Sequence, residues 1–215
     1  MTWLKDGERY SRLENNKQTG GTDIVAYRAK DNSREVIIPS SLLTDKSTGR
    51  PIPVRSVSWS ADNEKVLIYN NTRRVWRYDT RGDYWVLNLK DGALRQLGKG
   101  MPESSMMFAK FSPDGTRVAY VSNNNIYVED IDSGKITQLT KDGSDTIVNG
   151  TFDWVYEEEF SCRDGFRWSP DGKHIAYWQS DTKGTGVFDI INNVDSIYAK
   201  VIHFPYPKAG TPIQP

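Results

Sequence analysis

The chain has 215 residues, and its 28 Lys or Arg residues balance its 28 Asp or Glu residues, so the formal net charge is zero. That balance argues against a general nucleic-acid or polyanion binder, which normally carries a basic excess. Seven Trp and eleven Tyr residues favour strands over helices. No stretch of the sequence approaches the roughly 20 apolar residues that a membrane-spanning helix needs.

The sequence offers little material for a metal site or a catalytic thiol. Its one cysteine, Cys162, cannot form a disulfide within the chain, and we expect a half-buried small apolar residue there. The two histidines, His174 and His203, are scattered, and they give Cys162 neither zinc-ligand spacing nor a setting for nucleophilic catalysis. We expect both histidines to be structural, and we expect no metal and no cofactor.

The predicted elements begin close to the N-terminus. Met1 is followed at once by patterned sequence near Trp3, and there is no signal-peptide pattern. We therefore expect a trimmed chain from which a signal peptide has been removed. A first unit of strands is expected over residues 1–56.

A repeat follows, with copies in residues 57–69, 109–120 and 166–177. Its shared form is aromatic-Ser-Pro-Asp-Gly-x-x-aliphatic-Ala-Tyr, which predicts a strand, a tight turn and a second strand. In such a turn Pro presets φ, Asp bonds to its own backbone, and Gly accepts a positive φ. The alternating residues on both sides predict an antiparallel hairpin.

A second hairpin follows each of the first two copies. It covers residues 84–97 and 126–139, where two strands flank an Asp-Gly or Ser-Gly turn. Two hairpins make a four-stranded unit, and repeated units of this kind indicate a propeller. The expected fold class is therefore all-β: a partial β-propeller of about three four-stranded antiparallel blades.

The blades are expected at roughly 1–56, 57–107 and 108–215, the last with an insertion at 141–165. Closed propellers have roughly 4–8 blades, so three blades indicate a piece of a larger protein or a ring completed by self-association. Residues 205–212 are rich in Pro and are interpreted as a connector rather than a domain end.

The insertion contains aromatic residues followed by three consecutive carboxylates, Glu157, Glu158 and Glu159. Asp153 could cap a short helical turn, in which consecutive side chains point about 100° apart. Two adjacent Glu could then flank one cation, because its charge relieves their mutual repulsion. The alternative is a solvated acidic turn at the start of a helix, with no ligand.

The run at residues 153–159, Asp-Trp-Val-Tyr-Glu-Glu-Glu, resembles the double-Glu motif of the dipeptidyl peptidase IV family, in the prolyl oligopeptidase clan. This seven-residue motif is highly specific, whereas many propellers share the Ser-Pro-Asp-Gly repeat. Other segments resemble the family in the same order along nearly the whole chain: Trp3-Leu4, Glu14-Asn15-Asn16, Trp76-Arg77-Tyr78 and residues 205–210.

The resemblance implies the substrate-binding and gating propeller portion of a serine dipeptidyl peptidase, an enzyme that removes X-Pro or X-Ala dipeptides from peptide N-termini. By position, Glu158 and Glu159 match the family's Glu pair, which anchors the free α-ammonium and so fixes the cut two residues in. The residues that would support this short helix are Asp153, Trp154, Tyr156 and Glu157.

The resemblance also implies a parent protein that is bacterial, periplasmic or secreted, and homodimeric. Its expected partners are peptide substrates with a free N-terminus, and neither nucleic acid nor a membrane span is expected. The family's C-terminal α/β-hydrolase domain is absent, since the chain has no Gly-x-Ser-x-Gly nucleophile elbow. Without a catalytic triad, we expect this chain alone to be inactive.

Two departures from the family pattern affect the site. The family's substrate-contacting Arg is expected before the second signature hairpin, where residues 98–104 contain no Arg. Lys99 is the candidate substitute, and Arg95 is expected to be a strand residue. In addition, the loop after Glu159 is one apolar residue shorter than in some relatives.

Two other functions remain open from the residues alone. A non-enzymatic ligand- or protein-binding propeller would carry Glu158 and Glu159 as surface charges, with no special affinity for free peptide N-termini. A propeller that binds or hydrolyses glycans needs clustered Arg and an acid–base pair. Four neighbouring arginines are expected to form one polar edge of a hairpin instead: Arg73, Arg74, Arg77 and Arg81.

Overall fold

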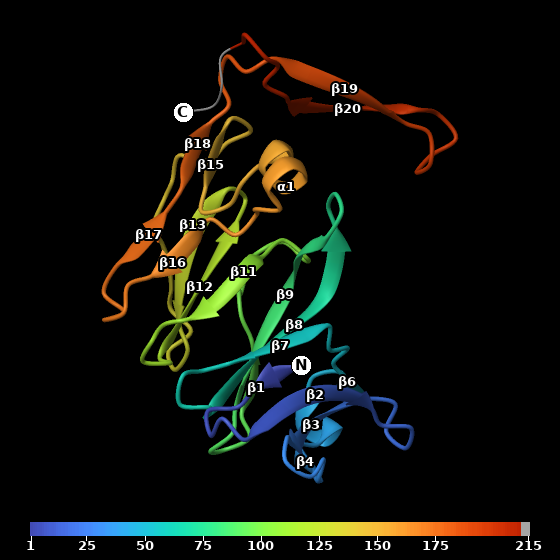
Figure 1. Cartoon of the computed structure of the whole chain (residues 1–215), viewed down its shortest axis with the longest axis vertical. Coiled ribbons are helices and arrows are strands. Elements are labelled where there is room, and N and C mark those ends of the chain that lie inside the picture. The colour runs from blue at the N-terminus through green and yellow to red at the C-terminus, as the bar shows by residue number, and fades with distance from the viewer. Residues whose placement is uncertain (212–215) are drawn as a thin grey trace.

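The computed structural model describes residues 1–211, which form mainly antiparallel β-sheets (Figure 1). Three four-stranded sheets succeed one another along the chain, and in each sheet every strand pairs with the next one in sequence. The first contains β1 (Thr2–Trp3), β2 (Arg9–Asn15), β3 (Thr22–Arg28) and β4 (Arg34–Ile38). The second contains β7 (Ser56–Trp59), β8 (Lys65–Arg74), β9 (Asp79–Asn88) and β10 (Leu94–Gln96). The third contains β11 (Met107–Phe111), β12 (Arg117–Ser122), β13 (Asn125–Asp130) and β14 (Ile136–Gln138).

After β14 the described strands pair in twos. The pairs are β15 (Ile147–Asn149) with β18 (Gln179–Asp181), β16 (Phe166–Trp168) with β17 (Ile175–Tyr177), and β19 (Val187–Asn192) with β20 (Lys200–Pro205). The segment expected as a third blade, 108–215, thus contains one four-stranded sheet and these three pairs. The connector expected at 205–212 ends outside the described residues.

Two shorter features complete the architecture. A 3-10 helix, η1 (Ser40–Leu43), leads into the small pair β5 (Thr44–Asp45) and β6 (Arg50–Pro51). The α-helix of the described part is α1 (Trp154–Phe160), which follows β15 and lies near the outer end of the long β8–β9 hairpin (Figure 1). The β19–β20 hairpin projects sideways from the sheets (Figure 1). Within residues 1–211, no helix has the length and apolar character needed to cross a membrane.

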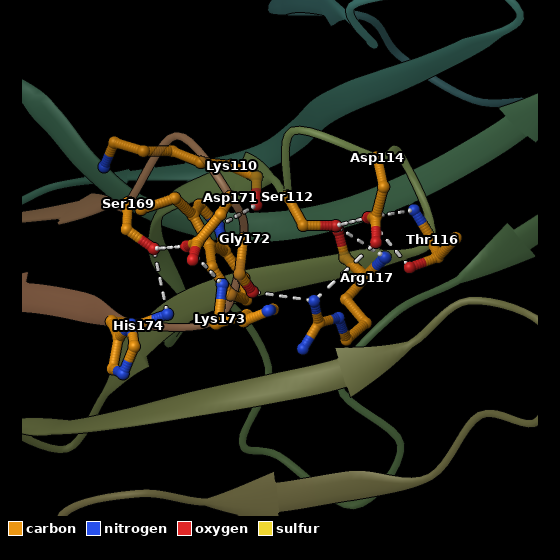
Figure 2. A network of polar contacts seen from close by, with 11 residues as sticks. Lys110, Ser112, Asp114, Thr116, Arg117, Ser169, Asp171, Gly172, Lys173 and His174 are labelled. Atoms are coloured by element: carbon orange, nitrogen blue, oxygen red, sulfur yellow. Dashed lines mark hydrogen bonds and ion pairs between the residues drawn. The ribbon is translucent and has the colours of Figure 1, made fainter.

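The repeated turn builds its hairpin through a buried serine. The Ser112 hydroxyl donates to Asp114 Oδ1 at 2.5 Å and accepts from the backbone N–H of Arg117 at 3.0 Å (Figure 2). Gly115 occupies the position with positive φ, at +67°. The first copy has Asn63 instead of Gly, with φ at +60°, which Asn tolerates better than most residues. All three copies form the expected antiparallel hairpins.

Successive turns also contact one another. Arg117 Nη2 donates to the carbonyl oxygen of Gly172 at 2.8 Å, which joins the second copy of the repeat to the third (Figure 2). The same guanidinium lies 5.1 Å from the centre of the Trp168 ring, within cation–π range. The repeat therefore supplies both the turn of one hairpin and a contact to the next.

The apolar core lies between consecutive sheets. Ile24 from the first sheet packs with Ile68 from the second, and both are fully buried. Leu67 from the second sheet packs with Tyr120 from the third, and Val121 of the third packs with Phe166 of β16. Because the second and third sheets each pack against a neighbour on both sides, the hydrophobic effect stabilises the series of sheets that positions α1.

Candidate functional site

The sequence around α1 defines both ends of this short helix. The Asp153 side chain accepts a hydrogen bond from the Tyr156 backbone N–H, and its own backbone is extended, as at an N-cap. At the other end Ser161 has a φ of +51°, and its N–H donates to the Glu157 carbonyl oxygen at 3.1 Å. The left-handed Ser161 thus ends the helix after Phe160, one residue beyond the acidic run.

Two aromatic contacts hold α1 in place. Tyr156 stacks on the buried ring of Phe152, with ring centres 4.8 Å apart. Trp154 packs on the other side against Phe204 of β20 at 4.5 Å and against Tyr206 at 5.6 Å. The helix is thus packed between the segment that precedes it and the base of the β19–β20 hairpin.

The three consecutive carboxylates have three different environments. Glu157 is buried, with 2% of its surface exposed, whereas Glu158 is partly buried and Glu159 is exposed. Successive helical side chains point about 100° apart, so one turn of helix can direct them toward the core, the neighbouring hairpin and solvent. Only the last two are available to a ligand.

Glu158 forms an ion pair with Arg77, which lies in the turn of the β8–β9 hairpin. Arg77 Nε lies 2.6 Å from Oε1 and 2.7 Å from Oε2 of the carboxylate. This hydrogen bond lowers the pKa of Glu158 below its usual 4.5 and raises the pKa of Arg77. Glu158 is therefore ionised throughout the neutral range.

Glu157 contacts the same hairpin turn through a fully buried carboxylate. Its Oε1 accepts the backbone N–H of Arg77 at 3.1 Å, and its Oε2 lies 3.4 Å from Nε of Arg163. Burial lowers the pKa of the Arg163 guanidinium, and the charge of Glu157 acts in the opposite direction. The two side chains therefore form a buried pair of opposite charges beneath the exposed part of the site.

Glu159 is the unengaged carboxylate of the three. It makes no hydrogen bond or ion pair with any residue in the described range 1–211. Counted together, Glu158, Glu159 and Arg77 carry one net negative charge. The exposed part of the site therefore favours a single cation.

The cation expected to replace the family Arg lies elsewhere. Lys99 lines a cavity of about 670 Å³ together with Arg95 and Glu129, and it makes no ion pair with any described residue. The cation beside Glu158 is Arg77. The structure brings Arg77 rather than Lys99 to Glu158, because the ten-residue strands β8 and β9 carry their turn to α1, whereas the loop after β10 lines a different pocket.

Sequence reasoning therefore missed two residues of the site, Arg77 and Arg163. The sequence did contain an indication of Arg77, since Trp76-Arg77-Tyr78 is one of the segments that resemble the family. For Arg163 there was no signal, because its relation to Glu157 depends on the reversal of the chain after α1.

The chain is similar to proteins of one family. A family model described as "Dipeptidyl peptidase IV (DPP IV) N-terminal region" matches residues 60–215. "Dipeptidyl aminopeptidase B" of Saccharomyces cerevisiae is 35% identical over 169 residues, which are 76% of this chain and 20% of that protein. "Probable dipeptidyl-aminopeptidase B" of Aspergillus oryzae is 28% identical over 220 residues, 96% of this chain and 24% of that protein.

A solved structure shows the same similarity in three dimensions. The crystal structure of Porphyromonas gingivalis dipeptidyl peptidase 4 superposes with a TM-score of 0.79 at 27% identity, over 97% of this chain and 29% of that one. The chain thus spans about a fifth to a quarter of the length of these two curated relatives. The all-β antiparallel fold expected from the repeats is confirmed, and it is similar to the propeller of that enzyme.

Proposed function

Because the chain belongs to the dipeptidyl peptidase IV family, as part of its N-terminal region, we propose that it is the substrate-binding and gating propeller portion of a serine dipeptidyl peptidase. In this proposal Glu158 and Glu159 bind the free α-ammonium of a peptide substrate. The parent enzyme then removes X-Pro or X-Ala dipeptides, because the anchored amine fixes the distance to the cleaved bond.

The charge arrangement at α1 is the observation that carries the proposal. Glu159 is exposed and pairs with no side chain of residues 1–211, while the hydrogen bond from Arg77 favours the ionised form of Glu158. An incoming ammonium would bring the net charge of these three groups to zero, and charge-assisted hydrogen bonds are among the stronger ones. Arg77 contacts Glu158 through Nε, and its two terminal nitrogens donate to no group in the described part of the chain, so they suit a substrate carbonyl oxygen.

The supporting residues act through packing and capping. Asp153 begins the helix, while Trp154 and Tyr156 pack its two sides against aromatic neighbours. We assign them to holding α1 in place rather than to contact with the substrate. Glu157 belongs to the same group because it is buried.

The remaining parts of the proposal concern the parent protein. An α/β-hydrolase domain would supply the nucleophile and the rest of the pocket, so this chain alone would not cleave peptides. We further propose a homodimeric, periplasmic or secreted bacterial enzyme.

Calorimetric titration of the chain with the peptide Ala-Pro-Ala and with its N-acetylated twin tests the function. The free peptide should bind with a Kd on the order of 1 mM, about −4 kcal/mol, since part of the pocket is missing. The acetylated peptide should not bind. Glu158→Gln and Glu159→Gln should each abolish binding, whereas Glu8→Gln, a change at an exposed Glu outside the site, should leave it unchanged.

The pH dependence gives a second criterion. Binding should decline above about pH 8, where the α-amino group loses its proton, and again in acid, below the pKa of Glu158, which the hydrogen bond from Arg77 holds under its usual 4.5. Equal binding of both peptides would favour the non-enzymatic binding propeller instead. If neither peptide binds, the same titration of the full-length parent decides.

A further inference from the structure

We propose that Glu157 is a positioning residue: it holds the turn of the β8–β9 hairpin against α1 so that Arg77 reaches Glu158, with Arg163 as its buried counter-ion. The consequence for peptide binding depends on the proposed function, but the positioning role does not. The observation behind it is that two consecutive carboxylates of α1 contact one residue at two different points.

Glu157 contacts the backbone of Arg77, and Glu158 contacts its side chain. The Arg77 N–H donates to Glu157 Oε1 at 3.1 Å, and the Nε of the same residue donates to Glu158. The partners are 80 and 81 residues apart in the sequence. A residue held at both its backbone and its side chain has little freedom to rotate, so its guanidinium is directed at the carboxylate pair.

The side-chain contact alone is a weak anchor. The Arg77 side chain is 65% exposed, although that of Glu158 is only 16% exposed, and an ion pair with one solvent-exposed partner contributes little, because solvent screens it and ordering a long side chain costs entropy. The Glu157 carboxylate has no exposed surface, so its hydrogen bond to the hairpin is not weakened by competing water. We therefore assign the placement of the turn to Glu157 rather than to Glu158.

Arg163 makes this buried carboxylate possible. An unpaired buried carboxylate is costly, and the Arg163 side chain is itself only 11% exposed. Oε2 of Glu157 and Nε of Arg163 form no hydrogen bond with any described group, so they interact through charge alone. A Gln at position 157 would thus keep an acceptor for the Arg77 N–H while removing the charge that Arg163 needs.

The test measures hydrogen exchange of the Arg77 backbone N–H and side-chain Nε–H by NMR in the complete 215-residue chain. In Glu157→Ala, protection of the backbone N–H should fall about tenfold, the effect of one lost hydrogen bond, and exchange of the Nε–H should increase. In Glu157→Gln, backbone protection should stay within about twofold of the wild type, while stability to urea falls. Glu159→Gln is the matched control on the same helix, and neither signal should change.

A double variant covers the case in which Glu157→Ala does not fold. Glu157→Leu with Arg163→Met removes both buried charges, a replacement that proteins often tolerate, and it also removes the acceptor. It should fold, as judged by protected amides of β12, and it should lose Arg77 backbone protection. A folded variant without the acceptor that keeps wild-type protection at Arg77 would overturn the positioning role.

Peptide titration separates this inference from the proposed function. Glu157→Ala should weaken binding of the free-amine peptide about tenfold, and Glu157→Gln less than threefold. If the wild-type chain and its parent bind no peptide, the proposed function fails, yet the exchange data still decide whether Glu157 positions Arg77. If peptide binds and Glu157→Ala changes neither affinity nor exchange, the positioning role fails and the proposed function stands.

Discussion

Arg77 and Glu158 lie 81 residues apart in the chain, yet Nε of the arginine contacts both carboxylate oxygens of the glutamate, at 2.6 and 2.7 Å. The contact joins the turn of the β8–β9 hairpin, in the second sheet, to α1, the helix that follows β15. It sets the charge state of the carboxylate that we assign to ammonium binding.

Removing the arginine should change the titration of Glu158. In Arg77→Met the pKa of Glu158 should return toward its usual 4.5, because the hydrogen bond that lowers it is lost. The stabilisation from this pair is present above the unfolded pKa and is lost as pH falls through the lower folded value, so the variant should lack that acid dependence. NMR titration of the Glu158 carboxyl carbon measures the pKa.

The matched control for this titration is Lys99→Met, which removes the cation that the sequence favoured. It should leave the Glu158 titration unchanged, since Lys99 lines a different cavity. A larger shift in this control than in Arg77→Met would reverse the assignment of the two cations.

Lys110 should make stability depend on pH in the alkaline range. Its ammonium lies 2.5 Å from Asp164 and 3.7 Å from the centre of the Phe166 ring, and burial lowers its pKa from 10.5 to about 8. Between these values the unfolded chain holds a proton that the folded chain has released. The free energy of unfolding should therefore rise with pH, by about 3 kcal/mol across the window.

Urea denaturation at pH 8 and pH 9.5 checks this slope. Lys110→Met should abolish the rise, whereas Lys173→Met, at an exposed position in the third repeat turn, should keep it. Equal slopes in wild type and Lys110→Met would show that another group titrates.

Phe204 should be the most sensitive residue of the aromatic cluster beside α1. Its ring is 4% exposed and contacts Trp154 at 4.5 Å and Trp76 at 5.8 Å. Phe204→Ala should lower the free energy of unfolding by about 3 kcal/mol, because it leaves a cavity between three segments. Phe188→Ala is the control: this neighbour is 43% exposed, and a loss of about 1 kcal/mol or less is expected. Losses of similar size in urea denaturation would contradict this ranking.

Gly82 lies in β9 beside Tyr69 and Asn70 of β8. A Cβ there would lie 2.4 Å from Cε2 of Tyr69 and 2.6 Å from the carbonyl oxygen of Asn70, both too short for contact. Gly82→Ala should therefore destabilise the chain by about 2 kcal/mol, as overpacking does. At Gly186 the nearest atom would be 3.7 Å away, so Gly186→Ala should change the unfolding midpoint little. A Gly82→Ala variant as stable as wild type would show that the hairpin can shift.

Much of the fold could be predicted because its determinants are local. The turn at Ser112 and Asp114 is held by contacts between residues no more than five positions apart, so a local sequence pattern is enough to predict it. The alternation of apolar and polar residues on either side of the turn predicts the hairpin, and the recurrence of this pattern along the chain predicts a series of similar sheets. What the repeat could not give is the pairing after β14, where β15 pairs with β18 across 30 residues that include α1 and another hairpin.

The candidate site likewise has features that the sequence predicts and features that depend on tertiary packing. The sequence by itself determined the acidic run, the capping Asp153 and the resemblance that singled out Glu158 and Glu159. Only the tertiary structure decided that Glu157 is buried against Arg163 and that Arg77, not Lys99, is the cation beside Glu158. Helical geometry requires consecutive side chains to diverge, but which direction faces the core depends on packing across distant segments. That packing brings a hairpin turn 80 residues away to α1, and no local pattern encodes it.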